Sequence, residues 1–193
     1  AEYDIPTTDF EKKFFADIQK FAFYSSLNKK CEQNTGKDIP ALMACKEYKQ
    51  VVSNLLEKHG LNYGSLPKGL LLFHTYPDTF RTAMEEHLAE GAMYAKNNFG
   101  KVNIHFTVSP EHKALFEELV KEKVSCYEDK FSVTYDISFS VQKPSTDTIA
   151  VNLDNTPFRD KEGNLFFRPG GHGALIENLN DMDADVVFIK NID

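Results

Sequence analysis

The chain has 193 residues, of which 41% are apolar and 12% aromatic, and it carries a formal net charge of −7. This apolar content excludes a disordered chain and suffices for one sizeable core, so we expect a single domain, or one domain with an appended helical part. The acidic balance, without a basic tract or stripe, argues against a general nucleic-acid binder and against a partner at anionic membranes.

Cysteine usage and hydropathy point to a cytoplasmic protein. Cys31, Cys45 and Cys126 are widely spaced and form no C-x-x-C pair, which indicates neither a disulfide framework nor a structural zinc site. The sequence contains no secretory signal and no apolar run of about 18 residues, the length that a membrane span requires. Because the chain begins at Ala1 and stops at Asp193 directly after an apolar run, we expect a fragment of a longer protein.

Residues 1–61 are predicted to form a helical N-terminal segment or insertion. Apolar residues recur at helix spacing after Thr8 or Asp9, which are alternative N-caps of the first helix. A second helical pattern covers residues 39–58, and Gly60 is its expected C-cap. We expect the Phe and Leu stripes of these helices to form a core.

Residues 62–193 are predicted to form an α/β core in which strands and helices alternate. The expected elements are a helix over 79–98, a strand over 101–108, a helix from Ser109 to about Tyr127, strands over 132–141 and 148–153, a turn or hairpin over 155–164, a strand over 165–167 and a terminal strand over 185–189. Such alternation implies a mostly parallel sheet flanked by helices, which is Rossmann-like, and ligands of these sheets bind at the carboxyl ends of the strands.

One predicted strand runs directly into a glycine-rich loop. The loop is Arg168-Pro169-Gly170-Gly171-His172-Gly173, and a helical pattern follows it. Glycine permits positive φ and the close approach of a ligand, and the first turn of a helix leaves backbone N–H groups unpaired, so an anion or a base edge fits there. The alternative is a tight strand-to-helix turn with a purely structural role.

Hydroxyl, imidazole, amide, ammonium and carboxylate groups follow the other strands: Ser109 and His112, then Gln142 and Lys143, then Lys190, Asn191 and Asp193. This mixture suits a phosphorylated ligand. A carboxylate after a buried strand commonly holds Mg²⁺, so Asp193 is a candidate metal ligand, the alternative being a cap of the next helix.

Lys68 stands in a stiff turn, Pro67-Lys68-Gly69, because proline restricts φ and glycine relieves crowding. An ammonium held 4 Å from a phosphate contributes roughly 4 kcal/mol before desolvation at an effective dielectric constant of 20, enough to matter to a transition state. The alternative is a solvated surface lysine.

The histidines do not form a recognisable metal site or catalytic triad. None shows the i, i+4 pairing of a zinc-binding helix, and Ser109 stands before a proline rather than in a G-x-S-x-G elbow. His105 alternates with apolar neighbours and is expected to be a packed strand residue.

The ordered motifs resemble those of a known enzyme family. The uridylyltransferase branch of the sugar nucleotidyltransferases carries four short motifs in order, P-K, Q-x-x-x-P, P-x-G-H-G and N-x-D-N. This sequence contains similar elements in the same order: Pro67-Lys68-Gly69-Leu70, Gln142-Lys143-Pro144, Pro169-Gly170-Gly171-His172-Gly173 and Phe188-Ile189-Lys190-Asn191-Ile192-Asp193. Over the whole chain the sequence is similar to an uncharacterised bacterial domain family of unknown function that looks like a distant relative of these enzymes.

The resemblance implies a nucleotide-diphospho-sugar transferase fold. It also implies attack of a sugar 1-phosphate on the α-phosphorus of a nucleoside triphosphate, with release of pyrophosphate, so that catalysis is positioning and charge neutralisation. It assigns catalytic phosphate contact to Lys68 and Mg²⁺ binding to Asp193. The candidate nucleotide-binding residues are Gln142, Lys143, Arg168, Gly170, Gly171, His172, Gly173 and Asn191.

The departures from the family limit this expectation. The Gly-rich phosphate loop expected shortly before Lys68 is missing, helical residues stand in its place, and Pro144 follows Gln142 too closely. The last Asn of N-x-D-N falls beyond Asp193. We therefore expect this chain neither to release pyrophosphate nor to bind nucleotide tightly, and turnover would show that the loop is dispensable.

The alternatives are a non-catalytic module that binds a nucleotide or phospho-sugar, and an unrelated α/β hydrolase-type domain that uses His and Asp.

Overall fold

The computed structural model describes residues 5–192. Within them the chain divides into two compact units, one reaching to His87 and including Asn191 and Ile192, the other spanning Leu88–Lys190. The first unit holds both the helical segment and the hairpin that follows it. The boundary that we expect between residues 61 and 62 therefore lies inside this unit and stays a prediction.

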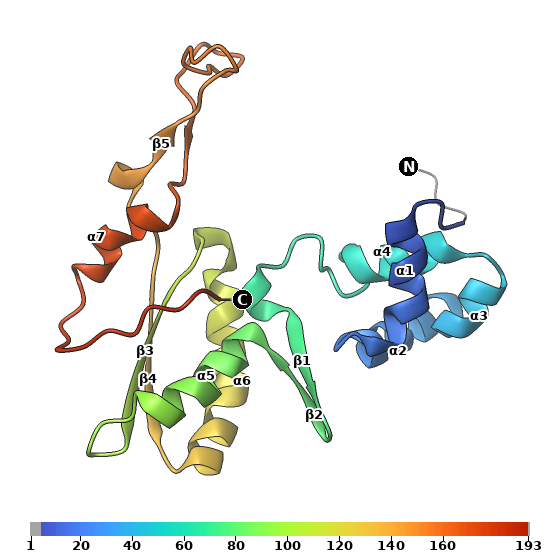
Figure 1. Cartoon of the computed structure of the whole chain (residues 1–193), viewed down its shortest axis with the longest axis horizontal. Helices are drawn as coiled ribbons and strands as arrows, with labels where there is room; N and C mark the ends of the chain where they lie inside the picture. The colour runs from blue at the N-terminus through green and yellow to red at the C-terminus, as the bar shows by residue number, and fades with distance from the viewer. Residues whose placement is uncertain (1–4, 193) are drawn as a thin grey trace. The chain divides into compact units, whose positions relative to one another are not determined.

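The amino-terminal part of the first unit is helical, as predicted. Its helices are α1 (Asp9–Asp17), the short 3-10 helix η1 (Ile18–Lys20), α2 (Tyr24–Thr35), α3 (Ile39–Ala44) and α4 (Tyr48–Leu56) (Figure 1). Thr8, not Asp9, is the N-cap of α1, because it forms a capping box with Glu11: the Glu11 N–H donates to Thr8 Oγ1 at 3.1 Å, and the Thr8 N–H donates to Glu11 Oε2 at 2.9 Å.

The single helix predicted over residues 39–58 is divided in two. Lys46 has a φ of 61°, a left-handed conformation through which a right-handed helix cannot continue. The prediction of Gly60 as C-cap was wrong, because α4 ends with Glu57 as its C-cap.

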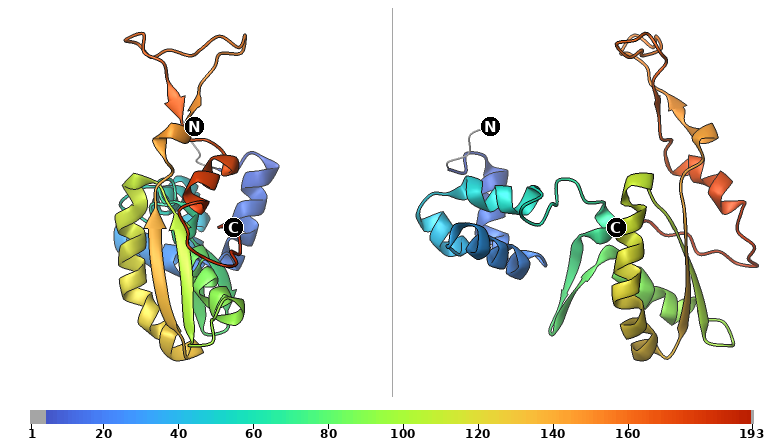
Figure 2. Two further views of the ribbon diagram at one scale, coloured as in Figure 1. Left: turned by 90° about the vertical axis from the view of Figure 1, so that its left-hand side faces the viewer. Right: turned by 180° about the vertical axis from the view of Figure 1, so that it is seen from behind.

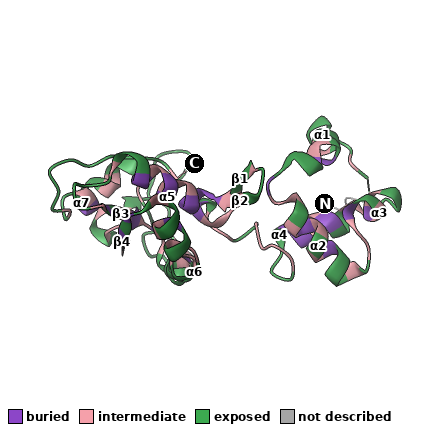
Figure 3. Ribbon diagram, turned by 90° about the horizontal axis from the view of Figure 1, so that it is seen from below, coloured by how far each residue is buried: buried purple, intermediate pink, exposed green. Residues whose placement is uncertain are grey.

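An apolar core holds these helices together. Leu27 and Cys31 of α2, Leu42 of α3 and Val51 of α4 have exposed fractions of 0%. Figure 3 shows buried positions of these helices in purple. Burial raises the pKa of the Cys31 thiol to about 11, so this thiol stays protonated at neutral pH. The predicted apolar stripes therefore form a core.

A hairpin and a helix follow the turn that carries Lys68. The turn is η2 (Lys68–Leu70), and it leads to β1 (Leu72–Tyr76), β2 (Thr79–Thr82) and α5 (Ala83–Tyr94). The helix predicted over residues 79–98 begins later, because Thr82 forms a buried capping box with Glu85. The Glu85 N–H donates to Thr82 Oγ1 at 3.2 Å, and the Thr82 N–H donates to Glu85 Oε2 at 2.8 Å.

The second unit is built around a parallel pair of strands. β3 (Lys101–Thr107) leads through η3 (Pro110–His112) and α6 (Lys113–Phe131) to β4 (Thr134–Ser140), which pairs with β3 (Figure 2). The period of two predicted for both strands is confirmed. On one face Val102 and Tyr135 are buried against Leu88 of α5 and Tyr127 of α6, whereas the opposite face is polar along both strands.

The rest of the second unit has little regular structure. Its elements are η4 (Pro144–Thr146), β5 (Thr148–Ile149), β6 (Phe167–Arg168), η5 (His172–Leu175) and α7 (Ile176–Leu179). β5 and β6 are antiparallel, and further bridges join Val151 to Pro157 and Arg159 to Leu165, so the predicted hairpin region is confirmed.

The terminal strand predicted over residues 185–189 does not form in the structure. Val186, Phe188 and Ile189 have exposed fractions of 72%, 58% and 76%, because no described strand pairs with this segment. Within the described residues the sheets are three pairs, one parallel and two antiparallel, in place of one larger parallel sheet. The mixed α/β class is confirmed, whereas the mostly parallel sheet is not formed by the described residues.

The helices of the described region are too short or too polar to cross a lipid bilayer. Even α6, with 19 residues, carries charged side chains along its length.

Leu42→Ala is expected to lower the free energy of unfolding by about 2–5 kcal/mol, because it opens a cavity in a fully buried site. Chemical denaturation followed by circular dichroism measures this change. The matched control is Leu56→Ala, at a position with an exposed fraction of 44%, which should cost much less. Equal losses in both variants would contradict the core described above.

Candidate functional site

The structure brings Gln142 next to the glycine loop. We use the name glycine loop for residues 168–173 and the name strand-end turn for residues 141–147, which follow β4. A Cβ placed on Gly170 would lie 2.9 Å from the Thr146 carbonyl oxygen and 3.5 Å from Gln142 Nε2. Two segments that are far apart in the sequence therefore meet at the carboxyl end of β4, the edge at which parallel sheets bind ligands.

The glycines of the loop do not use the left-handed conformation that glycine permits. Positive φ occurs at Gly36, Gly100 and Gly163, and not in the glycine loop. Gly170 is instead required for close approach, since its Cβ would also lie 2.7 Å from the Cβ of Ala174. Around Gly171 and Gly173 nothing lies within 4 Å of such a Cβ, so these positions leave open space for a ligand.

Two side-chain contacts connect the residues after the glycine loop to the end of β4. Asn178 of α7 is buried, and its Nδ2 donates to Ser140 Oγ at 2.8 Å and to the Val141 carbonyl oxygen at 2.9 Å. Lys143 Nζ forms an ion pair with Asp181 Oδ2 at 2.7 Å. This lysine is therefore already neutralised, and a phosphate at Lys143 would compete with Asp181.

His105 joins the two strands on their polar face. Its Nδ1 lies 2.8 Å from Ser138 Oγ and its Nε2 lies 2.8 Å from Ser140 Oγ, which is also 3.3 Å from Thr107 Oγ1. Burial lowers the pKa of His105, which favours the neutral imidazole with one nitrogen donating and the other accepting. His105 is thus a strand residue that packs against β4, half-buried on the polar face.

The contacts of His105 do not support a catalytic triad at this residue. A triad needs a group that stabilises the imidazolium formed during catalysis, usually a carboxylate on the second ring nitrogen. In the structure both nitrogens of His105 contact serine hydroxyls.

Arg168 and His172 are part of the glycine loop, and both are exposed. Lys68 is exposed at the start of η2, and Asn191 is also exposed; both belong to the first unit. Asp193 lies outside the described residues. The structure therefore gathers Gln142, Lys143 and the glycine loop, and leaves the roles of Lys68, Asn191 and Asp193 as predictions.

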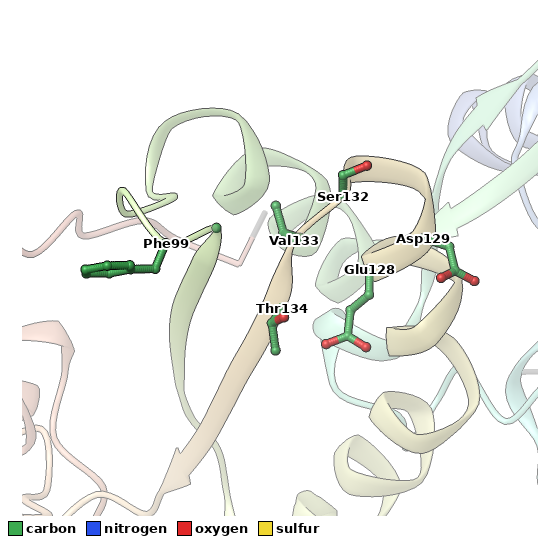
Figure 4. Close-up of a pocket in the computed structure, with 7 residues that line it drawn as sticks. Phe99, Glu128, Asp129, Ser132, Val133 and Thr134 are labelled. Carbon is green, nitrogen blue, oxygen red and sulfur yellow. The ribbon is translucent and has the colours of Figure 1, made fainter.

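A pocket of about 340 Å³ lies at the opposite ends of the strands (Figure 4). It is lined by Phe99, Gly100, Glu128, Asp129, Ser132, Val133 and Thr134. The carboxylates of Glu128 and Asp129 disfavour an anion there, so this pocket is a poor site for a phosphorylated ligand.

A polar cluster in the first unit has a structural explanation. Glu86 Oε2 accepts hydrogen bonds from Tyr76 Oη at 3.0 Å and Arg81 Nη1 at 3.2 Å, and Glu86 Oε1 lies 3.1 Å from His74 Nδ1. These contacts attach the β1–β2 hairpin to α5. His, Cys, Asp and Glu side chains form no group of three or more suited to a metal ion anywhere in residues 5–192.

Ser138, Ser140 and Asn178 were not identified from the sequence. The alternation of β4 places Ser138 and Ser140 on the polar face, so the strand register could have paired them with His105. No sequence signal identifies Asn178, because a helical asparagine is usually exposed and its buried contacts are tertiary.

Comparison with known proteins gives the family of the chain. Residues 1–193 match the family described as a domain of unknown function, DUF4301, and the chain belongs to this family. No curated protein and no solved structure matches it. The expected membership of an uncharacterised family is thus confirmed, whereas the resemblance to uridylyltransferases rests on the motifs quoted above.

Gly170→Ala is expected to destabilise the contact between the glycine loop and the strand-end turn. The new methyl group would meet the Thr146 carbonyl oxygen, a backbone atom, at 2.9 Å, and we expect a loss of about 1–3 kcal/mol in the free energy of unfolding. Gly171→Ala is the matched control, because its φ of −73° suits alanine and nothing lies within 4 Å. The steric assignment is wrong if both variants unfold alike in urea.

The stability of the protein should depend on the protonation of His105. Because burial lowers its pKa in the folded state, the unfolded state takes up the proton first as the pH falls below about 6.5. The free energy of unfolding should therefore fall between pH 7 and 5 more steeply in the wild type than in His105→Gln, which cannot titrate. Urea denaturation at both pH values measures the two slopes. Parallel pH dependences would exclude a titrating role for His105.

Proposed function

We propose that this member of the DUF4301 family binds a nucleotide at the carboxyl end of the β3–β4 pair, between the strand-end turn and the glycine loop. The observation that carries the proposal is the proximity of Gln142 to Gly170, which joins two motifs matched independently in the sequence. The resemblance to uridylyltransferases assigns a nucleotide contact to each of these motifs.

The groups at this edge suit a nucleobase and its sugar. The Gln142 side chain offers an amide group to the edge of a base, although its Nε2 donates to Asp147 Oδ1 at 3.3 Å. The open space around Gly171 and Gly173 lets a planar ring approach the backbone. Lys143 supplies a positive charge for phosphate once Asp181 is displaced from it.

Nucleotidyl transfer to a sugar 1-phosphate is the reaction that the resemblance favours. In this proposal the chain adopts part of a nucleotide-diphospho-sugar transferase fold, with Lys68 neutralising phosphate charge. The expected Mg²⁺ depends on Asp193, which is outside the described part of the chain, and the described residues do not gather a metal-binding group.

A non-catalytic binding module is the second candidate. One observation favours it for this chain: Lys143 is already ion-paired with Asp181. A module of this kind needs only the glycine loop and the strand-end turn.

Titration of the ¹⁵N-labelled protein with UTP tests the proposed binding. Saturable NMR shifts are expected at Gly171, Gly173 and the Gln142 side-chain amide. Gln142→Ala should weaken binding about fivefold, the equivalent of one neutral hydrogen bond of about 1 kcal/mol. Gln50→Ala, at an exposed position in α4, is the matched control and should bind as the wild type does.

Two further arms separate the alternatives. If UTP produces no saturable shifts, the protein does not bind it. If tripolyphosphate produces the same shifts as UTP and Gln142→Ala does not alter them, the protein recognises phosphate and not the base. Pyrophosphate release in the presence of UTP, Mg²⁺ and glucose 1-phosphate would support the transferase, and binding without release would support the module.

A further inference from the structure

A polar contact joins α7 to the end of β4. Asn178 is a buried polar residue with an exposed fraction of 5%. Its Nδ2 uses both protons, one toward Ser140 Oγ and one toward the Val141 carbonyl oxygen. Because a carbonyl oxygen only accepts, this contact determines which end of the amide faces the strand.

The other end of the Asn178 amide has no hydrogen-bond partner. Its Oδ1 is buried and makes no hydrogen bond in the structure. A buried polar side chain with an unsatisfied oxygen is unfavourable for stability, and an apolar residue would avoid this penalty. The favourable polar contacts of Asn178 are therefore its two donated hydrogen bonds, which offset the cost of the unsatisfied oxygen.

One of these hydrogen bonds acts on the backbone next to Gln142, and the other acts on the Ser140 side chain. The Val141 carbonyl belongs to the peptide unit that precedes Gln142, so the bond orients that peptide. Ser140 Oγ is in turn held by His105 Nε2, which connects Asn178 to β3. One side chain thus anchors the strand end from which Gln142 projects.

The same helical segment also determines the position of the glycine loop. Ala174 belongs to η5 and Asn178 to α7, which follows η5 without a break. The Cβ of Ala174 is the atom nearest to a Cβ placed on Gly170, and the Ala174 N–H donates to the Gly171 carbonyl oxygen at 2.9 Å. Movement of Asn178 away from β4 would therefore move the loop away from Gln142.

We propose that Asn178 is a positioning residue of the nucleotide site: it holds α7 against the end of β4 and so determines the separation between Gln142 and the glycine loop. This inference rests on the proposed function. It identifies a residue outside the matched motifs on which nucleotide affinity depends.

A double-mutant cycle with UTP tests the inference. Asn178→Ala should weaken binding about tenfold, and Asn178→Ala combined with Gln142→Ala should bind no more weakly than the weaker of the two single variants, because both changes disable the same contact. Additive losses would overturn the proposal, since a merely structural role would weaken binding independently of Gln142. Asn180→Ala, at an exposed position directly after α7, is the matched control.

Hydrogen exchange in the absence of nucleotide separates this inference from the proposed function. Asn178→Ala should speed exchange of the Ala174 amide several-fold, whereas Asn180→Ala should not. If the wild type fails to bind UTP but this difference is observed, the proposed function fails and the positioning of the loop by Asn178 stands. Unchanged exchange would overturn the positioning itself.

A third variant covers the case in which Asn178→Ala does not fold. Ser140→Ala removes one acceptor of Asn178 and leaves the Val141 carbonyl in place. It should produce a smaller effect of the same kind on Ala174 exchange and on UTP affinity. No effect on either measurement would overturn the proposal.

Discussion

The parallel pairing of β3 with β4 is the constraint on which the second unit depends. Parallel strands place their carboxyl ends at one edge, and the ladder determines which side chains face each other. Here it sets His105 opposite Ser138 and Thr107 opposite Ser140. Burial of the other face against α5 and α6 stabilises this register, because a shift by one residue would expose Val102 and Tyr135 to water. The position of Gln142, which follows β4, is a consequence of the same pairing.

Two contacts of different physical kind then hold the glycine loop beside Gln142. One is steric: Gly170 approaches Thr146 and Ala174 more closely than any side chain would allow. The other is polar and directional, because the Asn178 amide donates to two acceptors at the end of β4. The helices of the first unit pack around an apolar core, and the N–H of buried Ile39 donates to Asn28 Oδ1 at 2.9 Å. Directional contacts such as those of Asn178 support a ligand site, because a ligand site needs fixed geometry.

Most sequence predictions were right where an element depends on residues close in the sequence, and wrong where it depends on distant ones. The N-cap at Thr8 was among the predicted candidates because a capping box is local, and the strands β3 and β4 were found because their alternation matches one apolar face. The helix over 79–98 was drawn too long, although the Thr82–Glu85 box that shortens it is also local. The terminal strand was predicted from the apolar run over residues 185–189, and a run of this kind becomes a strand only where a neighbour pairs with it. The lack of a Cβ at the loop glycines was expected to admit a ligand, but at Gly170 it serves a contact within the chain that composition cannot show.

By itself the sequence determined the mixed α/β class, the helical start of the chain, the alternation of the central strands and the motifs at Lys68, Gln142 and Gly170. These features depend on residue type, spacing and order, which are present in the chain before it folds. Only the tertiary structure decided that Gln142 meets the glycine loop, that Asp181 neutralises Lys143 and that Asn178 anchors the end of β4. Each of these contacts joins residues that the sequence separates, so it exists only once the strands are paired and the chain has returned to the same edge.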